Sequence, residues 1–493
     1  MTTPALIAPL PARRRSGAPG GRLLIVSNRL PMTMRVQRGA VRVQRSSGGL
    51  ATGLRGVHSD TGGIWIGWPG LSTEQAGALW PEMQRRLNEV GAAGIPLSRR
   101  ELDGFYSRYS NGTLWPVLHD RVDHPAPDDA AWALYRAVNQ RYADAVVERL
   151  RPGDRVWIHD YQLMLVPRLV RERCPHARIG YFLHTPFPDP SSFATLLHAS
   201  ELLDGLLGAD VIGFHTSAYA RRFLHAVGEQ SHREVRGDDV LIGSRRVHVG
   251  AFAMGIDVAS FDACAAEPDV RIEAQRLRGT RGVARMLGVD RLDYTKGITE
   301  RLLAFEQLLT RSPEWRGRVQ LSQLAVPSRE DVRAYRSLRE HVEQVVNRIN
   351  GAFARPGWTP VEYRYGSVDM SALVALYRAA DVMVVTPIRD GMNLVAKEFV
   401  ASRSDCRGTL VLGERAGAAE ELRSSLLVDP TDTDALVQTY RTALGMSAAE
   451  QRTRMRGLRH IVAGNDVFRW AAGFLESLDS RTAKRRALVL RLG

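Results

Sequence analysis

The chain has 493 residues, of which 44% are hydrophobic and 24% charged, and its formal net charge is +14. This composition excludes a disordered, collagen-like or disulfide-scaffold protein, and the length favours two domains, or three, over a single core. The two ends, residues 1–22 and 480–493, supply nine of the fourteen net charges, so the body of the chain lacks the concentrated basic face that a nucleic-acid reader needs.

The cysteines and the hydropathy pattern favour a cytoplasmic protein. Cys174, Cys264 and Cys406 lie far apart, without a CxxC pair or a Cys/His cluster of metal-ligand spacing. Neither disulfides nor zinc are indicated, and a reducing compartment fits best. No run of about 20 apolar residues could span a membrane. The apolar stretch 5–10 is short and precedes the arginines, unlike a signal peptide.

Buried strands are expected to alternate with helices in the first half of the chain, as in a doubly wound parallel sheet. A polar turn is expected at 28–29, and a loop is expected to lead from it to Ser46. The alternation breaks at 229–252, where a hairpin is expected to turn at Gly243 and Ser244. The expected strands are 22–27, 64–67, 155–158, 179–183 and 210–214, and the expected helices are 50–54, 131–150 and 162–173.

The alternation restarts after a joint at 252–284. Two Rossmann-like units that face each other place the carboxyl ends of both sheets on one cleft, which is the usual ligand site of open α/β sheets. The expected strands are 285–289, 318–324, 361–365, 382–386 and 409–413, and the expected helices are 298–310, 329–350, 370–380, 392–402, 447–462 and 467–478.

A charged loop at 288–297 follows a strand and precedes a helix. Its Arg291 and Lys296 can both reach a diphosphate and neutralise the charge on a departing nucleotide. The alternative is a surface loop in which these cations pair with Asp290 and Asp293. Only three of the 67 basic residues are lysines, which favours a functional role for Lys296, because a compact ammonium stands there in place of a planar guanidinium.

A second strand–turn–helix segment spans residues 386–398. Asp390 lies at its glycine turn, the amides of 391–394 point from a helix N-terminus toward an anion or a sugar hydroxyl, and Glu398 lies one or two turns along the helix. In the alternative interpretation, Asp390 caps the helix and Glu398 pairs with Lys397 or with solvent.

Three shorter signals lie in the first half. Residues 157–161 end a strand with the carboxylate of Asp160, and residues 183–188 place His184 in a loop stiffened by prolines. The glycine-rich residues 47–49 permit a close approach of the backbone to a ligand. Each signal is equally compatible with a simple turn.

Several motifs of other enzyme classes do not occur. The sequence has no GxxxxGK[ST] loop, no GxSxG elbow and no HExxH motif. Asp432 and Asp434 resemble a metal-binding DxD pair, but they follow Pro430 and open a helix, which favours N-terminal capping. A metal-dependent sugar transfer is therefore not indicated.

Taken together, these motifs resemble the trehalose-6-phosphate synthase family over about residues 22–475. The resemblance implies a GT-B fold with an acceptor domain at 22–252, a nucleotide-sugar domain at 253–462 and a helix at 463–480 that returns to the first domain, between a disordered basic leader (1–21) and a basic tail (481–493). The matching segments, in the family's order and spacing, are 27–29, 47–49, 65–68, 114–116, 157–160, 182–184, 290–297 and 389–398.

The resemblance also assigns a donor site. Arg291 and Lys296 resemble the pair that grips the donor diphosphate, and Glu398 the carboxylate on the nucleotide ribose. Asp390 resembles the group that holds the glucose hydroxyls, and His184 the histidine beside that glucose. The remaining implied donor contacts are Gly48, Gly49, Val368, Gly391, Met392, Asn393, Leu394 and Val395.

On the acceptor side, Arg29, Tyr106, Trp115 and Arg329 resemble the cradle for the 6-phosphate of glucose. Asp160 and Trp68 resemble the residues that lie against the acceptor sugar. The implied catalytic set is Asp160, His184, Arg291, Lys296 and Asp390.

The implied reaction is a transfer of glucose from a nucleoside diphosphate to glucose 6-phosphate with retention of the anomeric configuration, without a metal or cofactor. UDP-glucose is the first expectation for the donor, but Val368 stands where some relatives have phenylalanine near the base, so GDP- and ADP-glucose stay open. We expect a cytoplasmic homo-oligomer, a dimer or tetramer, that binds neither nucleic acid nor membrane.

Three alternatives remain. Transfer to another phosphorylated acceptor, such as glycerol 3-phosphate, is disfavoured by the intact phosphate cradle. A silent regulatory subunit would be expected to have lost Asp160, Arg291, Lys296 or Glu398, and all are present. A nucleic-acid-associated protein rests only on the basic ends.

Overall fold

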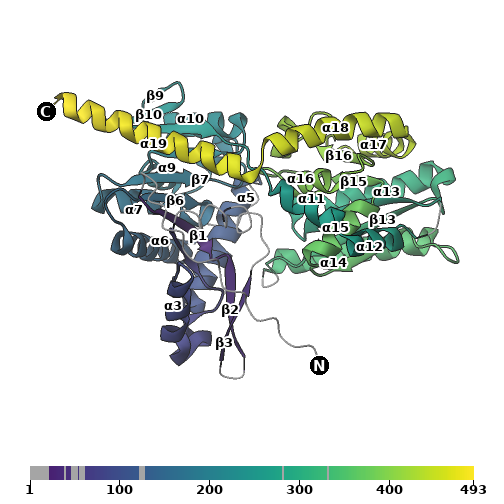
Figure 1. Ribbon diagram of the computed structural model, residues 1–493, viewed down its shortest axis with the longest axis horizontal. Helices are drawn as coiled ribbons and strands as arrows, with labels where there is room; N and C mark the ends of the chain where they lie inside the picture. The colour runs from purple at the N-terminus through teal and green to yellow at the C-terminus, as the bar shows by residue number, and fades with distance from the viewer. Residues whose placement is uncertain are drawn as a thin grey trace.

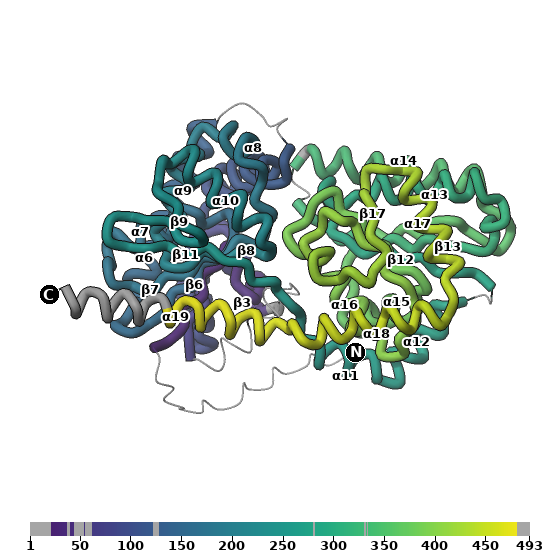
Figure 2. Tube along the Cα trace, turned by 90° about the horizontal axis from the view of Figure 1, so that it is seen from above, coloured from purple at the N-terminus to yellow at the C-terminus, as the bar shows by residue number. Residues whose placement is uncertain are grey.

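Two α/β halves, each built on its own sheet, lie side by side in the computed structural model (Figure 1). The structure describes residues 21–37, 40–45, 54, 62–121, 128–279, 282–329 and 332–492. The predicted α/β fold class is confirmed, because strands and helices alternate in both halves. Figure 2 shows the same two bodies from above, with the C-terminal helix lying along the N-terminal half.

The N-terminal sheet has nine strands in the order β5-β4-β1-β6-β7-β8-β11-β10-β9. The pairs from β5 to β11 are parallel, and β10 and β9 add an antiparallel edge. Its first strand is a continuous apolar run with both faces covered, as is usual in parallel sheets. The strands are β1 (Leu23–Arg29), β4 (Ile64–Trp68), β5 (Ala92–Gly94), β6 (Arg155–His159), β7 (Arg178–Phe182), β8 (Val211–Phe214), β9 (Val235–Arg236), β10 (Asp239–Ile242) and β11 (Arg245–Ala251).

The helices of this half include one irregular element that carries a site residue. Leu102–Leu114 (η2) is a π-helix of 13 residues that holds Tyr106 and leads directly into the short helix α5 (Trp115–Leu118). π-helical segments are rare and concentrate at functional sites. The other helices are α2 (Thr73–Ala76), α3 (Trp80–Glu89), α4 (Arg99–Glu101), α6 (Asp129–Arg149), α7 (Val166–Arg173), α8 (Pro190–Ala194), α9 (Ala199–Leu206) and α10 (Ser217–Gln230).

The C-terminal sheet is parallel throughout, in the order β14-β13-β12-β15-β16-β17. Its strands are β12 (Ala284–Arg291), β13 (Val319–Val326), β14 (Val361–Tyr365), β15 (Val382–Val385), β16 (Thr409–Gly413) and β17 (Leu426–Val428). Its helices are α11 (Val258–Ala266), α12 (Pro268–Arg278), α13 (Ile298–Arg311), α14 (Arg333–Phe353), α15 (Met370–Ala379), α16 (Leu394–Ser402), α17 (Thr433–Gly445) and α18 (Ala448–Gly464).

Two expectations about local structure are wrong. The loop expected between the turn at 28–29 and Ser46 contains an antiparallel hairpin of β2 (Met32–Gln37) and β3 (Ala40–Arg45). The helix expected from Arg329 begins at Arg333, and Arg329 itself has a φ of 48°, which no helical residue adopts.

The expected capping role of Asp432 is confirmed, because its carboxylate accepts the Ala435 N–H at 2.9 Å as the N-cap of α17.

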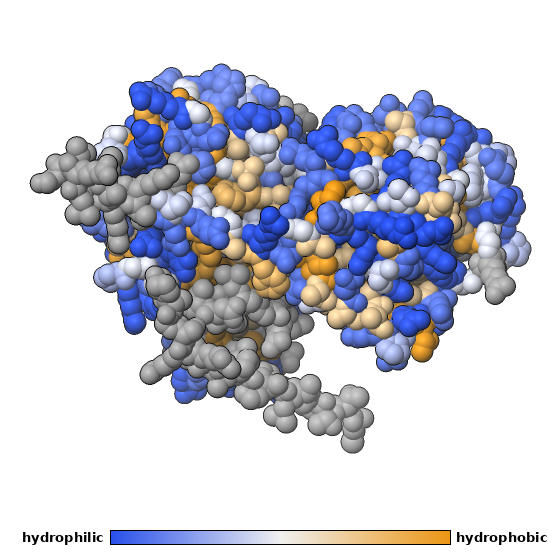
Figure 3. Space-filling view, turned by 45° about the horizontal axis from the view of Figure 1, so that its top comes forward, coloured by the Kyte–Doolittle hydropathy of each residue, from blue (hydrophilic) through white to orange (hydrophobic). Residues whose placement is uncertain are grey.

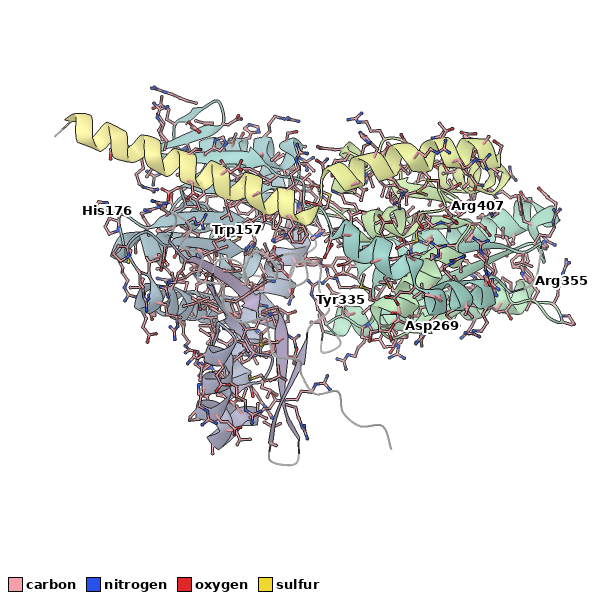
Figure 4. The ribbon with its side chains drawn as sticks, viewed as in Figure 1. Trp157, His176, Asp269, Tyr335, Arg355 and Arg407 are labelled. Atoms are coloured by element: carbon pink, nitrogen blue, oxygen red, sulfur yellow. The ribbon has the colours of Figure 1, made fainter. Side chains whose placement is uncertain are left out.

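The last helix, α19 (Val467–Leu492), lies across the N-terminal half (Figures 1 and 4). Its aromatic side chains pack on the N-terminal sheet. Phe474 stacks on Trp157 with ring centroids 4.6 Å apart. Gly180 and Gly213 leave room for this ring, since a Cβ at Gly180 would lie 2.6 Å from Phe474. The contact buries Trp157 and Phe474 completely, so the C-terminal helix is part of the core of the N-terminal half.

The chain crosses twice between the halves, and Lys397 connects the two crossing segments. Its Nζ donates to the Met254 carbonyl at 2.8 Å in the first crossing and pairs with Glu421 at 2.5 Å. Glu421 also accepts from Asn465, which lies in the second crossing between α18 and α19. The alternative pairing of Lys397 with Glu398 is therefore wrong.

The surface of the face in Figure 3 is mainly hydrophilic, with hydrophobic residues in small groups. No helix among the described residues combines the length and the apolar character that a bilayer span requires. All three cysteines are unpaired.

Replacement of Phe474 by alanine tests the packing of α19. We expect Phe474→Ala to lower the free energy of unfolding by about 3–5 kcal/mol, because it leaves a cavity against Trp157. Phe468 on the same helix is 45% exposed, so Phe468→Ala should cost about 0.5 kcal/mol or less. Denaturant unfolding followed by tryptophan fluorescence measures both, and equal losses would contradict the packing described.

Candidate active site

The site forms where the carboxyl ends of strands from both sheets meet. Arg29 and Trp68 end β1 and β4, and Asp160 and His184 follow β6 and β7. From the other sheet come Arg291 at the end of β12 and Asp390 after β15. The halves touch here: the Tyr219 hydroxyl donates to the Asp390 carbonyl at 3.0 Å.

Glycine is required where the loop at Gly391 meets the loop at His184. A Cβ on Gly391 would lie 2.0 Å from the carbonyl oxygen of His184, so any other residue would push the two loops apart. Figure 4 labels Tyr335 where the two halves approach each other.

Arg329 is held between the halves by a buried network. It donates to the carboxylate of Asp293 at 2.8 Å and to the Tyr161 hydroxyl at 3.1 Å, and its guanidinium lies 3.9 Å from the centre of the Trp115 ring. Asp293 also accepts from the Tyr335 hydroxyl at 3.0 Å. The strained backbone of Arg329 (φ 48°) is stabilised by these contacts.

The charge of Asp293 is stabilised in spite of its burial. Burial alone would raise the pKa of this carboxyl, but the positive charges of Arg329, Lys296 and Arg291 lower it to about 2. The carboxylate is thus ionised at any physiological pH. The expected alternative of a surface salt-bridge loop is wrong, because Asp290 and Asp293 are buried and pair with Arg301 and Arg329.

The other residues predicted for the acceptor cradle surround Arg329. The guanidinium of Arg29 lies 5.3 Å from the centre of the Trp68 ring and donates to Thr33 at 3.2 Å. The phenol of Tyr106 is close enough to act electrostatically on both Arg29 and Arg329. The structure therefore brings together all four side chains of the predicted phosphate cradle, Arg29, Tyr106, Trp115 and Arg329.

On the donor side, Lys296 and Asp390 form a direct ion pair. Nζ of Lys296 lies 2.6 Å from Oδ2 of Asp390, and Asn393 donates to the same oxygen at 3.1 Å. Burial would raise the pKa of Asp390, but the charge and hydrogen bond of Lys296 hold it below its usual range. Helix α16 is capped by Asn393, so the alternative role of Asp390 as the helix cap is wrong.

Two arginines of the site carry charge without a neutralising acid. Arg29 and Arg291 are exposed, and no carboxylate among the residues that the structure describes lies within ion-pair distance of either. Arg291 also lies 5.8 Å from the centre of the Trp115 ring. Among the described residues, each half therefore contributes one site arginine without an acid partner, Arg29 from the N-terminal half and Arg291 from the C-terminal half, which favours anionic ligands.

Glu398 faces a buried phenol in place of a lysine or bulk solvent. It accepts from the Tyr377 hydroxyl at 2.8 Å. Burial raises the pKa of this carboxyl, and the hydrogen bond from Tyr377 opposes the rise. Val368, the expected neighbour of the base, follows β14 and packs partly buried against the core that contains Tyr377.

Asp160 and His184 lie next to each other in the N-terminal half. The backbone N–H of His184 donates to Oδ1 of Asp160 at 3.3 Å. Nε2 of the His184 ring lies 3.1 Å from Nδ1 of His159. Burial raises the pKa of Asp160 to about 6 and lowers that of His184 to about 3. The imidazole is therefore neutral at pH 7. The predicted contacts Gly48 and Gly49 lie outside the described residues.

Sequence analysis missed several residues that shape this site. Tyr161, Tyr335 and His159 contact predicted site residues. Tyr335 carries no motif of its own, and in the segment 157–161 only Asp160 is assigned a role from the sequence. The ring centre of His119 lies 4.2 Å from that of Trp115. The Nδ1–H of His119 donates to the Trp115 carbonyl at 2.8 Å. Its position four residues after Trp115 is the only sequence signal of this contact.

Comparison with known proteins identifies the family. The model of glycosyltransferase family 20 matches residues 21–480. The chain belongs to this family.

Two relatives with similar sequences agree with this assignment. A trehalose-6-phosphate synthase from Mycobacterium avium is 42% identical over 467 residues, with 92% of this chain and 94% of the relative covered. A bifunctional trehalose-6-phosphate synthase/phosphatase from Thermoproteus tenax is 42% identical over 477 residues, and these cover 94% of this chain but only 64% of that longer protein.

Solved structures share the fold of this family 20 chain. An α,α-trehalose-phosphate synthase from Burkholderia xenovorans in complex with glucose 6-phosphate aligns with a TM-score of 0.82 at 34% identity and covers 93% of this chain and 100% of its own. An E. coli protein bound with UDP-2-fluoro glucose aligns with the same score and identity and covers 93% of this chain and 99% of its own. The GT-B architecture of the chain is therefore the fold of these proteins.

The pKa of Asp160 predicts how its replacement changes stability with pH. Because the folded pKa of about 6 lies above the ordinary pKa of an aspartate side chain, the buried charge destabilises the native state above pH 6, and this destabilisation is lost as the pH falls through 6 toward 4. Asp160→Asn should therefore raise the unfolding temperature at about pH 7.5, and the gain should shrink at about pH 4.5. Thermal unfolding of both proteins measures this, and a gain that is constant with pH would contradict the assignment.

Proposed function

We propose that the chain is a UDP-forming trehalose-6-phosphate synthase, which moves glucose from UDP-glucose to glucose 6-phosphate and gives α,α-trehalose 6-phosphate. The observation that carries the proposal is the gathering of four cationic side chains where the two halves meet, which we divide into two clusters, Arg291 with Lys296 and Arg29 with Arg329. Two phosphorylated substrates need two such sites, close enough for their sugars to react.

The acceptor side is suited to a sugar phosphate. Arg29 and Arg329 provide planar donors that match the geometry of a phosphate group. The indole Nε1 of Trp115 is buried and has no hydrogen-bond partner among the described residues, so it is available to a ligand oxygen. Trp68 and Asp160 lie at the strand ends beside these groups, where they would bind the acceptor sugar.

The donor side is suited to a nucleotide sugar. Arg291 and Lys296 would bind the diphosphate, and Asp390 with the amides of Gly391 to Val395 would bind the glucose hydroxyls at the start of α16. Glu398, whose carboxylate lies deeper along the same helix, would accept from the ribose. The binding of UDP-2-fluoro glucose by the E. coli relative supports uridine as the base.

The chemistry follows from this charge distribution. The bond between glucose C1 and the diphosphate oxygen breaks, and Arg291 and Lys296 stabilise the negative charge that develops on the leaving group. The 1-hydroxyl of glucose 6-phosphate attacks from the same face, and its proton passes to the departing diphosphate. The neutral imidazole of His184 and the carboxyl group of Asp160 would orient the two sugars. The anomeric configuration of the donor is retained.

Further parts of the proposal concern the whole protein. We assign residues 22–252 to acceptor binding, 253–462 to the nucleotide sugar and 463–480 to the helix that returns to the first domain. The unpaired cysteines are compatible with a reducing cytoplasm. The dimer or tetramer stays a prediction, which light scattering of the purified protein would test.

Product analysis tests the proposed reaction. Chelator-treated protein is incubated with glucose 6-phosphate and, separately, UDP-, GDP- and ADP-glucose, and the products are identified by mass spectrometry and NMR. We expect an α,α-1,1-linked disaccharide phosphate, formed fastest from UDP-glucose. No product with any donor, together with transfer to glycerol 3-phosphate, would show that the acceptor is different.

Removal of the diphosphate cations tests the donor assignment. Lys296→Ala and Arg291→Ala should each lower kcat on the order of 100-fold, because each removes a charge that stabilises the leaving group. Arg276 is an exposed arginine that pairs with Glu273 on α12, and Arg276→Ala should leave kcat unchanged. Unchanged turnover in both site variants would rule out the assignment.

A further inference from the structure

Asp120 has a strained backbone and no role in the site described so far. Its φ is 56°, and it is one of six non-glycine residues with positive φ among the described residues. Three of the others, Asp160, Arg329 and Asn393, lie in the active site. Backbone strain of this kind costs free energy and concentrates at functional sites, so the position of Asp120 calls for a functional explanation.

The carboxylate of Asp120 connects the two halves. Its Oδ1 accepts the Asp189 N–H at 2.8 Å, at the end of the loop that begins with His184. Its Oδ2 forms an ion pair with Arg389, which belongs to the C-terminal half and directly precedes Asp390. The side chains of Asp120 and Arg389 are 22% and 16% exposed, so solvent screens this pair only in part.

Arg389 also makes a backbone contact within its own, C-terminal half. Its N–H lies 3.4 Å from the Thr295 carbonyl, next to Lys296, and its Nη2 lies 3.5 Å from the Phe187 carbonyl in the opposite half. The ion pair therefore joins three segments, and each carries a residue of the proposed site: Trp115, His184 and Asp390.

We propose that the Asp120–Arg389 ion pair is a positioning device that holds the donor-glucose loop of the C-terminal half against the His184 loop of the N-terminal half. It keeps Asp390 and its partner Lys296 in register with the acceptor side. Neither Asp120 nor Arg389 needs to touch the reacting atoms. This inference rests on the proposed function.

Arg222 provides a matched control. It lies on α10 in the same half as Asp120, its Nη1 is 3.7 Å from Oδ2 of Asp120, and it donates to the same Phe187 carbonyl at 3.5 Å. Arg222 and Arg389 thus contact the same two groups, but only Arg389 crosses between the halves. If the only consequence of a variant were the loss of a positive charge near Asp120, replacing either arginine would have the same effect on activity.

The test compares Asp120→Asn, Arg389→Gln, Arg222→Gln and the double variant Asp120→Asn/Arg389→Gln. Asparagine keeps the size of Asp120 and tolerates the left-handed backbone, so only the charge is removed. We expect Asp120→Asn and Arg389→Gln to lower kcat about tenfold or more, because small displacements of reacting groups are costly. Isothermal titration should give a Kd for UDP within about twofold of the wild type, because the proposed UDP site lies in the C-terminal half and is independent of the contact between the halves.

The double variant distinguishes positioning from two unrelated losses. If the two residues act as a pair, its kcat should lie within about twofold of the lower single variant, and Arg222→Gln should keep wild-type kcat. Should Asp120→Asn fail to fold, Arg389→Lys, which retains the charge, should keep a higher kcat than Arg389→Gln. Additive losses, an equal loss in Arg222→Gln, or wild-type kcat in Asp120→Asn would overturn the proposal. Product formation by the wild type tests the reaction itself separately.

Discussion

The buried carboxylate of Asp293 determines how charge is arranged in the cleft. It is fully buried, and a carboxylate in such a place needs strong partners to remain ionised. It has them in Arg329, Tyr335 and the backbone and hydroxyl of Thr295. The Thr295 bonds shape the turn that presents Lys296, and the bond to Arg329 holds that guanidinium over Trp115. One acid of the C-terminal half thus positions a cation for each side of the site.

The remaining cations differ in how far they are neutralised. Lys296 is paired with Asp390, whereas Arg29 and Arg291 have no acid partner among the described residues. A site with paired and unpaired cations side by side has a net attraction for phosphorylated ligands but little freedom to rearrange, because the paired groups are already fixed. This is what a transfer between two anionic substrates requires, since the electrostatic stabilisation must be in place before the leaving group departs.

The sequence predicted the alternation of strands and helices well, because parallel strands buried on both faces are continuous apolar runs. It failed where long-range contacts decide the local structure. The hairpin at 32–45 has the alternating pattern of a strand pair but was expected to be a loop. Arg329 was expected to open a helix, yet its ion pair with Asp293 pulls it into a left-handed backbone conformation. Site residues with a motif were found, whereas Tyr335 and Asp120 act through partners far away in the chain and gave no local signal.

A crystal structure of the protein with UDP and glucose 6-phosphate tests the central claim, that two anion sites face each other across one cleft, most directly. We predict that the sugar phosphate contacts the guanidinium groups of Arg29 and Arg329, and that the diphosphate contacts Arg291 and Lys296, with the Lys296–Asp390 contact adjusted to admit it. Both anions on the same side, or a sugar phosphate bound away from Arg329, would contradict this account.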